Sequence, residues 1–307
     1  MNILVTGGAG FIGSNIVDAY VGLGHRVVVM DDLSTGRRSN LNDKAVFVGL
    51  DVRSPDLERL FRDYAIEFVN HQAARGDVRA SIDRPEEYAD VNVRGGVSLL
   101  ECCRKAKVRG VIYASTGGCV YGDAVYIPTD ETHPIRPRDP YGASKACFEI
   151  YLQTYRKLYD LPFTIFRYPN VYGPRQNPFG EAGVVSIFTK KMVRDEQVII
   201  NGSGTQERDF VFVEDVVRAN LLATQRSYDE AFNVGTGRGV SVNTIFAKLK
   251  AITGYGGSAV YGPPKAGEVE RSILTSDRIF EACGWKAEVD LDEGLVRTVD
   301  YIKSHEA

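Results

Sequence analysis

The feature that most constrains this chain is a glycine-rich turn that directly follows an apolar stretch at its start. Residues 2–6 predict a short buried strand, and residues 15–23 predict a helix. Between them stand Gly7, Gly10 and Gly13, which suit a tight turn, close approach of a diphosphate to the backbone, and close packing of helix on strand. Such a turn directs the free N–H groups of a helix N-terminus at a phosphate. Because the triplet follows a strand and opens a helix, it predicts a dinucleotide site rather than a ligand-free turn.

The composition sets the scale of the protein and excludes several classes of partner. A chain of 307 residues is long enough for about two domains. The net charge of -3 argues against a nucleic acid or an anionic membrane as partner, because both require a basic surface. No apolar stretch approaches the ~18 residues of a membrane helix, and the first strand begins too early for a signal peptide. We therefore expect a cytoplasmic protein.

The cysteines and histidines do not predict a metal site. The cysteines, none of which has C-x-x-C spacing, are Cys102, Cys103, Cys119, Cys147 and Cys283. Their pattern favours buried reduced thiols over a metal or disulfide framework. The histidines are scattered along the chain, and we expect His71, at the end of a predicted strand, to be a hydrogen-bonded structural residue.

Strands and helices alternate through the first half of the chain. After the first strand, the predicted elements are strands over 26–30, 46–49, 67–71 and 110–114 and helices over 88–105 and 140–159. This alternation predicts an α/β fold with a Rossmann-type, doubly wound parallel sheet that is covered by helices on both faces.

An acidic residue after the second predicted strand indicates which dinucleotide binds. Asp31 lies where a carboxylate receives the adenosine ribose hydroxyls in dinucleotide-binding folds. A carboxylate there repels a 2′-phosphate, so the sequence favours NAD over NADP. Arg37 and Arg38 argue for NADP, because basic residues just past this strand can accommodate the phosphate, but we expect them in a solvated loop.

Residues 139–145 predict the start of a helix that carries chemistry on one face. Asp139 suits the N-cap position and Pro140 the first helical position. Tyr141 and Lys145 then fall one turn apart on the same face. An ammonium group that close is expected to lower the pKa of the tyrosine from ~10 towards the working pH, as general acid/base chemistry requires. The alternative is an ordinary helix with two unrelated side chains.

Together these motifs resemble the extended short-chain dehydrogenase/reductases and, within that superfamily, the UDP-glucose (UDP-galactose) 4-epimerases. The resemblance spans nearly the whole chain. The segments that carry it are 6–13, 31–34, 71–74, 115–122, 141–145, 167–175, 202–210 and 233–237.

The resemblance implies two interleaved domains and a tightly held NAD. The NAD-binding Rossmann domain is expected over 1–169 and 214–240, and a smaller sugar-nucleotide substrate lobe over 170–213 and 241–307. The implied cofactor-binding residues are Gly7, Gly10, Phe11, Ile12, Gly13, Asp31, Asp32, Leu33, Ser34, Thr35, Gly36, Asp51, Val52, Gln72, Ala73, Ala74, Asn92, Tyr141, Lys145 and Tyr168.

The resemblance also implies catalytic residues, one of which stays open. Tyr141 and Lys145 are expected to act with a hydroxyl at the end of the fifth strand. Many epimerases carry that serine or threonine three residues before a Val-Tyr-Gly sequence, where this chain has Gly117. Thr116 or Ser115 must then supply the hydroxyl.

The implied substrate-binding residues are Thr116, Asn170, Arg208, Lys265 and Ser272. Arg208 is expected on the diphosphate, where its fork geometry suits two anionic phosphates. Lys265 stands where the family usually has a second phosphate-binding arginine. Ser272 stands where some epimerases carry a tyrosine, and a small residue there leaves room for an N-acetyl group.

The expected reaction is therefore NAD-dependent epimerisation at carbon 4 of a nucleotide sugar through a 4-keto intermediate. UDP-glucose and UDP-galactose are the first expected substrates, UDP-N-acetylhexosamines the second, and a homodimer is expected through the helices over 88–105 and 141–159. The alternatives are a UDP-glucuronate epimerase or decarboxylase, another nucleotide-sugar epimerase, or a non-catalytic NAD-binding sensor. A dehydratase requires an acid and a base beside the catalytic threonine, and Gly117 and Gly118 stand in those places.

Overall fold

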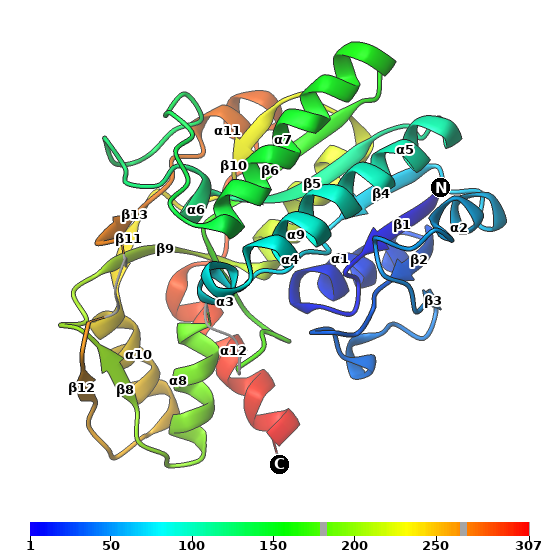
Figure 1. Cartoon of the computed structure of the whole chain (residues 1–307). Coiled ribbons are helices and arrows are strands. Elements are labelled where there is room, and N and C mark those ends of the chain that lie inside the picture. The colour runs from blue at the N-terminus through cyan, green and yellow to red at the C-terminus, as the bar shows by residue number, and fades with distance from the viewer. Residues whose placement is uncertain (179–182, 265–268, 307) are drawn as a thin grey trace. The chain divides into compact units, whose positions relative to one another are not determined.

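The chain forms two compact units, and the computed structural model describes residues 1–178, 183–264 and 269–306 (Figure 1). The segments of the first unit are Met1–Tyr121, Ile135–Arg167 and Val217–Phe232. Those of the second are Gly122–Pro134, Tyr168–Val216 and Asn233–Ala307. The units thus interleave along the chain. The segment 122–134 belongs to the second unit, whereas the sequence analysis assigned it to the first domain.

The first unit is built on a seven-stranded sheet in the order β10-β6-β5-β4-β1-β2-β3. Strand β1 pairs in parallel with β2 and β4, and the pairs β2–β3 and β4–β5 are also parallel. The strands are β1 Asn2–Thr6, β2 Arg26–Met30, β3 Val46–Val48, β4 Phe68–His71, β5 Val111–Thr116, β6 Phe163–Tyr168 and β10 Ala231–Asn233. The order 3-2-1-4-5-6 is that of the Rossmann fold, so the predicted doubly wound sheet is confirmed.

Helices cover both faces of this sheet (Figure 1). They are α1 Phe11–Gly22, α2 Leu57–Asp63, α3 Val78–Asp83, α5 Gly96–Ala106, α6 Gly117–Val120, α7 Pro140–Tyr159 and α9 Val213–Gln225. Leu4 and Val28 of the strands share one apolar cluster with Leu60 of α2, Leu99 of α5 and Phe148 of α7. Helix α1 contacts β1 and β2. Cover on both faces explains why the strands are continuous apolar runs rather than alternating sequences.

A buried polar cluster joins α1, β4 and α9 inside the first unit. The Asn70 amide nitrogen donates to the Tyr20 hydroxyl at 3.0 Å and to the Asn220 amide oxygen at 2.9 Å. The Tyr20 hydroxyl also lies 2.5 Å from the Thr224 hydroxyl. Because each polar group has a partner, the cluster specifies how these elements meet without leaving an unsatisfied buried group.

The segment predicted as one helix over 88–105 consists of three pieces. They are α4 Pro85–Tyr88, the π-helical segment η2 Ala89–Gly95, and α5. The π-helical turn places Asn92 inside the protein, where its amide nitrogen donates to the Ser144 hydroxyl of α7 at 2.9 Å. Such π-helical turns are frequent at functional sites.

The second unit has its own sheets and its own apolar core. Strand β9 is the centre of a four-stranded sheet, β12 and β8 pair separately, and α8, α10 and α12 contact one another. The elements are β7 Asn170–Tyr172, α8 Val184–Val193, β8 Ile199–Asn201, β9 Glu207–Phe212, β11 Gly239–Ser241, α10 Val242–Thr253, β12 Val260–Gly262, β13 Arg271–Ser272, α11 Asp277–Cys283 and α12 Leu291–Glu306. No helix in the described parts of the chain is both long and apolar enough to cross a bilayer.

We expect Gly13→Ala to destabilise the protein, whereas Gly22→Ala in the same helix will not. A Cβ at Gly13 would lie 2.2 Å from the Gly7 carbonyl oxygen, but a Cβ at Gly22 would meet nothing within 4 Å. Backbone must therefore move in the first variant, which we expect to lower the free energy of unfolding by about 2 kcal/mol or more. The second variant should gain up to about 1 kcal/mol from the lower entropy of the unfolded chain. Urea denaturation of both variants measures this, and equal stabilities would contradict the packing argument.

Candidate active site

The glycine turn between β1 and α1 closes at the carboxyl ends of β1 and β4. Gly7 has a φ of +66°, in the left-handed region that favours glycine, and a Cβ there would lie 2.7 Å from the Ala73 nitrogen. The Gly10 N–H donates to the Gly7 carbonyl at 3.0 Å, and α1 begins at Phe11. The helix begins earlier than predicted, so its N-terminus lies within the turn itself, as a diphosphate site requires.

A groove in the first unit runs along this turn and the neighbouring strand ends. Its lining residues are Gly7, Gly10, Met30, Asp31, Asp32, Ser34, Thr35, Leu50, Asp51, Val52, Gln72, Ala73, Ala74, Arg75 and Val91. Most of the residues predicted to bind the cofactor are thus brought together. Of the others, Phe11, Ile12 and Gly13 form the first turn of α1, and Leu33 and Gly36 belong to the loop around Asp31.

Asp31 organises the loop at the end of β2. Its carboxylate accepts from the Leu33 nitrogen at 2.8 Å and from the Ala9 nitrogen at 3.0 Å, and burial raises the pKa of this carboxyl group. A Cβ at Gly36 would lie 2.8 Å from it. Arg37 and Arg38 are exposed and do not line the groove. The groove therefore suits ribose hydroxyls better than a 2′-phosphate.

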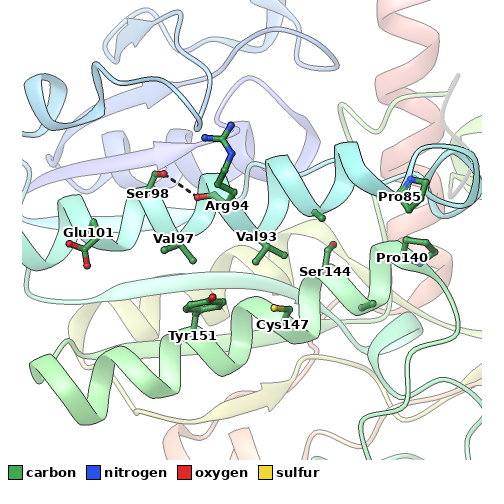
Figure 2. Close-up of a pocket in the computed structure, with 12 residues that line it drawn as sticks. Pro85, Val93, Arg94, Val97, Ser98, Glu101, Pro140, Ser144, Cys147 and Tyr151 are labelled. Atoms are coloured by element: carbon green, nitrogen blue, oxygen red, sulfur yellow. Dashed lines mark hydrogen bonds between the residues drawn. The ribbon is translucent and has the colours of Figure 1, made fainter.

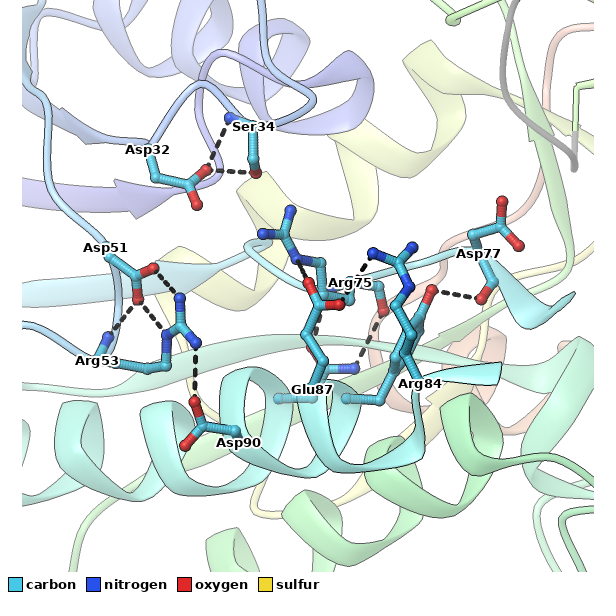
Figure 3. Close-up of polar contacts among 11 residues, drawn as sticks. Asp32, Ser34, Asp51, Arg53, Arg75, Asp77, Arg84, Glu87 and Asp90 are labelled. Carbon is cyan, nitrogen blue, oxygen red and sulfur yellow. Dashed lines mark hydrogen bonds and ion pairs between the residues drawn. The ribbon is translucent and has the colours of Figure 1, made fainter. Parts of the chain in front are cut away.

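Arg75 also lines the groove, although the sequence did not predict it as a site residue. Figure 3 shows its contact with Glu87. Among the described lining residues it is the one with a positive charge, whereas Asp31, Asp32 and Asp51 are acidic. Its Nε lies 2.9 Å from a Glu87 carboxylate oxygen. Its backbone nitrogen donates to the Asn92 side chain at 2.8 Å. The signal was its position directly after the predicted residues Gln72-Ala73-Ala74.

Tyr141, Lys145 and Thr116 meet where the first turns of α7 lie against the end of β5. Asp139 caps α7 as predicted, because its carboxylate accepts from the Gly142 nitrogen at 2.7 Å. The hydroxyl of Tyr141 is hydrogen-bonded to that of Thr116, the last residue of β5. The Lys145 Nζ donates to the Ala114 carbonyl oxygen at 2.7 Å.

The expected lowering of the pKa of Tyr141 is wrong. Burial raises the pKa of Tyr141 far above its ordinary value, and the Thr116 hydroxyl opposes this only in part. The physical reason is burial of the phenol, which disfavours its charged form; burial also lowers the pKa of Lys145, to about 7. The amine is also committed to a backbone carbonyl rather than to the phenol. A phenolate at neutral pH thus requires more positive charge than Lys145 alone supplies.

Ser115 and Thr116 are neighbours that point to different partners. The Ser115 hydroxyl donates to a Glu149 carboxylate oxygen at 2.5 Å inside the protein. The Thr116 hydroxyl is the one that meets Tyr141. His71 is structural, as expected: it is 1% exposed, its Nδ1 lies 2.7 Å from the Thr6 hydroxyl, and burial lowers its pKa to about 3.

In the second unit, three of the predicted substrate residues lie on neighbouring strands. Arg208 of β9 is the register partner of Ser272 of β13, and Asn170 of β7 pairs with Phe210, two residues further along β9. The Arg208 guanidinium donates to the Glu207 carbonyl at 2.8 Å. Tyr168, predicted to contact the cofactor, is buried at the end of β6. The predicted residue Lys265 lies outside the described residues.

Metal ligands and disulfides do not feature in the described structure. The described residues contain no group of three or more histidine, cysteine or acidic side chains that could hold a metal ion. Cys102, Cys103, Cys119, Cys147 and Cys283 are all free thiols. The polar groups that line the described groove are backbone groups, hydroxyls, carboxylates, the Gln72 amide and the Arg75 guanidinium.

This combination of a dinucleotide groove with a Tyr-Lys pair and a threonine is that of a nucleotide-sugar-modifying member of the extended short-chain dehydrogenase/reductases. Residues 3–235 match the NAD dependent epimerase/dehydratase family, and the chain belongs to that family. The predicted superfamily and the predicted cofactor, NAD, are thereby confirmed.

Within this family, the chain is similar along its whole length to several UDP-glucose 4-epimerases. The chain is 46% identical, over 99% of each chain, to a putative UDP-glucose 4-epimerase of Methanocaldococcus jannaschii. The crystal structure of a UDP-glucose 4-epimerase of Thermotoga maritima with UDP-glucose covers 100% of both chains with a TM-score of 0.98 and 47% identity. That of the Thermus thermophilus UDP-glucose 4-epimerase in complex with NAD covers 98% of this chain and 99% of its own, with a TM-score of 0.94 and 41% identity.

We expect Arg75→Gln to weaken binding of NAD+ and of ADP about tenfold, because Arg75 lines the groove and would give a bound diphosphate a charge-assisted contact. Binding of adenosine, which has no diphosphate, should change less than about twofold. Calorimetric titration of protein stripped of its cofactor measures all three ligands. Arg84→Gln is the matched control, because Arg84 pairs with the same Glu87 at 3.1 Å but does not line the groove. An equal loss for adenosine and ADP would contradict a diphosphate contact.

Proposed function

We propose that this chain is a UDP-glucose 4-epimerase that interconverts UDP-glucose and UDP-galactose through a 4-keto sugar, with NAD as a tightly held cofactor. The observation that carries the proposal is the contact between Tyr141 and Thr116, one turn from Lys145, in a chain of the epimerase family. The relatives that are 41–47% identical over nearly their full lengths support UDP-glucose as the substrate.

The groove of the first unit fits the cofactor. The glycine turn would hold the diphosphate, Asp31 the adenosine ribose, and Asp51 with Val52 the adenine end. Bound NAD supplies the capacity to accept a hydride from sugar carbon 4 and to return it. Lys145 would hold the nicotinamide ribose. The protein contributes position and electrostatics to chemistry that belongs to the cofactor.

Tyr141 is the acid and base of the proposed reaction. In the first half, the hydrogen of the C4–H bond would leave with the electron pair as the hydride that bound NAD can accept. The proton of the C4 hydroxyl would pass to the phenolate of Tyr141, and a C=O bond would form. In the second half, Tyr141 returns the proton while hydride adds to the opposite face of the sugar. Thr116, rather than Ser115, supplies the bridging hydroxyl, because the Ser115 hydroxyl already donates to Glu149. The hydride and the proton removed in the first half are both returned in the second, so the net reaction is an isomerisation.

The second unit is proposed to hold the nucleotide sugar. Arg208 suits the diphosphate because its guanidinium presents a fixed cation with fork geometry. Asn170 and Ser272 lie on the strands that pair with β9. The small side chain of Ser272 favours UDP-N-acetylhexosamines as a second substrate class.

A homodimer is the proposed assembly, through a groove between α5 with its preceding segment η2 and α7 (Figure 2). The groove has a volume of about 670 Å³, and apolar side chains such as Val93 and Val97 line it opposite Tyr151. Ile150 and Leu158 of α7 are 63% and 65% exposed. An apolar helical face of this kind is typical of an interface between two copies of one chain.

The proposed compartment is the cytoplasm. The free state of Cys102, Cys103, Cys119, Cys147 and Cys283 supports it. Thiols persist in reducing compartments, whereas proteins of oxidising compartments commonly form disulfides.

The test of the reaction is conversion of UDP-glucose to UDP-galactose by purified protein without added cofactor. We expect Tyr141→Phe to lower kcat by about 10²- to 10⁴-fold, because the acid/base group is lost. Binding of UDP should stay nearly unchanged. Thr116→Ala should lose at least about tenfold more activity than Ser115→Ala, since only Thr116 meets the phenol. Full activity in Tyr141→Phe would refute the mechanism, and turnover of UDP-glucuronate but not of UDP-glucose would favour the glucuronate alternative.

The test of the assembly is light scattering of two single variants. Tyr151→Glu places a charge in the apolar groove and should yield a monomer, because a buried unpaired carboxylate opposes association. Leu23→Glu is the control: Leu23, the C-cap residue of α1, is 60% exposed and does not line the groove, so this variant should keep the mass of a dimer. A wild-type monomer would refute the proposed dimer.

A further inference from the structure

One face of α7 meets the end of β5 at three successive turns. Tyr141, Lys145 and Glu149 follow one another at four-residue spacing, so their side chains share one face of the helix. They contact three consecutive residues of β5. Tyr141 meets the Thr116 hydroxyl, Lys145 donates to the Ala114 carbonyl, and Glu149 accepts from the Ser115 hydroxyl. The proposed function uses the first two of these contacts, and the third has no assigned role.

Glu149 is fixed in its place by a buried network. The side chain is 1% exposed, and the Arg167 side chain opposite it is 4% exposed. The Arg167 Nη2 lies 2.6 Å from one carboxylate oxygen, and its Nε contacts both oxygens at 3.1 and 3.2 Å. The Arg167 Nη1 donates to the Tyr121 hydroxyl at 2.9 Å. The Ser115 hydroxyl also donates to this carboxylate, so hydrogen bonds from two residues fix its orientation.

Stability does not require such a network. Replacing a buried ion pair by apolar side chains of similar volume is often neutral or stabilising, since both charges must be desolvated. Both charges are desolvated here, because the Glu149 and Arg167 side chains are almost fully buried. A buried pair in these surroundings calls for a role other than stability.

The surroundings of Lys145 indicate that role. From β5, the ring of Tyr113 lies with its centroid 4.8 Å from the amine, and from β4 the buried His71 is neutral because burial lowers its pKa to about 3. On α7 itself, the amine lies 5.9 Å from the Tyr141 ring centroid, and Glu149 is one turn further on. Burial lowers the pKa of Lys145 to about 7, and Glu149 opposes the lowering.

We propose that Glu149 is a positioning residue of the Tyr141–Lys145 pair: held by Arg167 and Ser115, it is the buried anion that keeps the Lys145 amine charged. The inference rests on the proposed function for its consequence, because a charged amine beside Tyr141 favours the phenolate that accepts the proton. The effect of Glu149 on the protonation of Lys145 is a property of the protein alone, and it is measurable without cofactor or substrate. The spacing from Tyr141 through Lys145 to Glu149 was visible in the sequence, but the partners of the carboxylate were not.

The first experiment measures the titration of Lys145 itself. Protein labelled with ¹³C at lysine Cε is titrated by NMR in the cofactor-free state, and the Lys145 signal is assigned through Lys145→Met. In Glu149→Gln we expect the pH of half-protonation of Lys145 to fall by about one unit or more. The direction follows from charge: without the anion, and with Arg167 left uncompensated, the protonated amine is less favourable.

A double variant separates electrostatics from folding. Glu149→Gln leaves the Arg167 charge buried without its partner, which can prevent folding. Glu149→Gln/Arg167→Met removes both charges, and the pH of half-protonation should still fall, because Glu149 is the charge that acts on Lys145. Tyr121→Phe is the matched control, since it removes a contact to Arg167 but leaves the Glu149 charge in place. It should titrate as wild type.

A lowered titration of Lys145 in either Glu149 variant, with Tyr121→Phe unchanged, supports the proposal. Wild-type titration in a folded Glu149 variant overturns it, and failure of both variants to fold also overturns it, because the pair would then be structural. In the epimerase assay, the alkaline limb of kcat against pH should move to lower pH in Glu149→Gln. Absence of turnover in the wild type would overturn the proposed function but would leave the titration result standing.

Discussion

The packing of α7 against the carboxyl end of β5 is the contact on which the candidate site depends. It brings Tyr141 to Thr116 and Lys145 to the Ala114 carbonyl. Neither contact is possible unless the helix has both the right rotation and the right height along the strand. The cap at Asp139, the Asn92–Ser144 hydrogen bond from the π-helical segment, and the Glu149–Ser115 hydrogen bond each restrict that placement.

The groove beside this contact follows from strand order. The order of the strands in the sheet reverses between β1 and β4, which remain parallel to each other, and such a switch point is where open α/β sheets bind their ligands. Backbone N–H groups of the Gly7–Gly13 turn can then face the opening that the reversal creates. The close approach of Gly7 to Ala73 explains why small residues stand on both sides of it. An acidic lining with Arg75 as its described cation suits a ligand that has both hydroxyl groups and a diphosphate.

Electrostatics in this site differ from what spacing alone suggests. Four-residue spacing correctly places Tyr141 and Lys145 on one face, yet burial raises the pKa of the phenol and lowers that of the amine to about 7. Both shifts have the same origin, since low polarity disfavours the charged form of each group. The phenol of Tyr141 is therefore held in its protonated form, and a charge near Lys145 shifts the pH at which this amine titrates.

Much of the fold and many of the site residues were predictable because they depend on local patterns. The apolar run at 2–6, the glycine triplet and the Asp139-Pro140 cap each specify structure within a few residues, and all of them form as predicted. Helix and strand ends were less predictable: β5 extends through Ser115 and Thr116, and the helix over 88–105 contains a π-helical turn. Such ends depend on packing between elements as well as on local sequence, and the close approach of Gly96 at the start of α5 to Phe148 of α7 is one contact of that kind.

The sequence by itself determined the order of elements, the dinucleotide turn and the spacing of Tyr141 and Lys145, because these follow from backbone geometry over one or two turns. Only the tertiary structure decided between Ser115 and Thr116 as the partner of the phenol. It also brought Arg167 of β6 to Glu149 of α7 and placed Arg75 in the groove. Adjacent strand residues point to opposite sides, and which side faces the helix depends on packing between segments far apart in the chain.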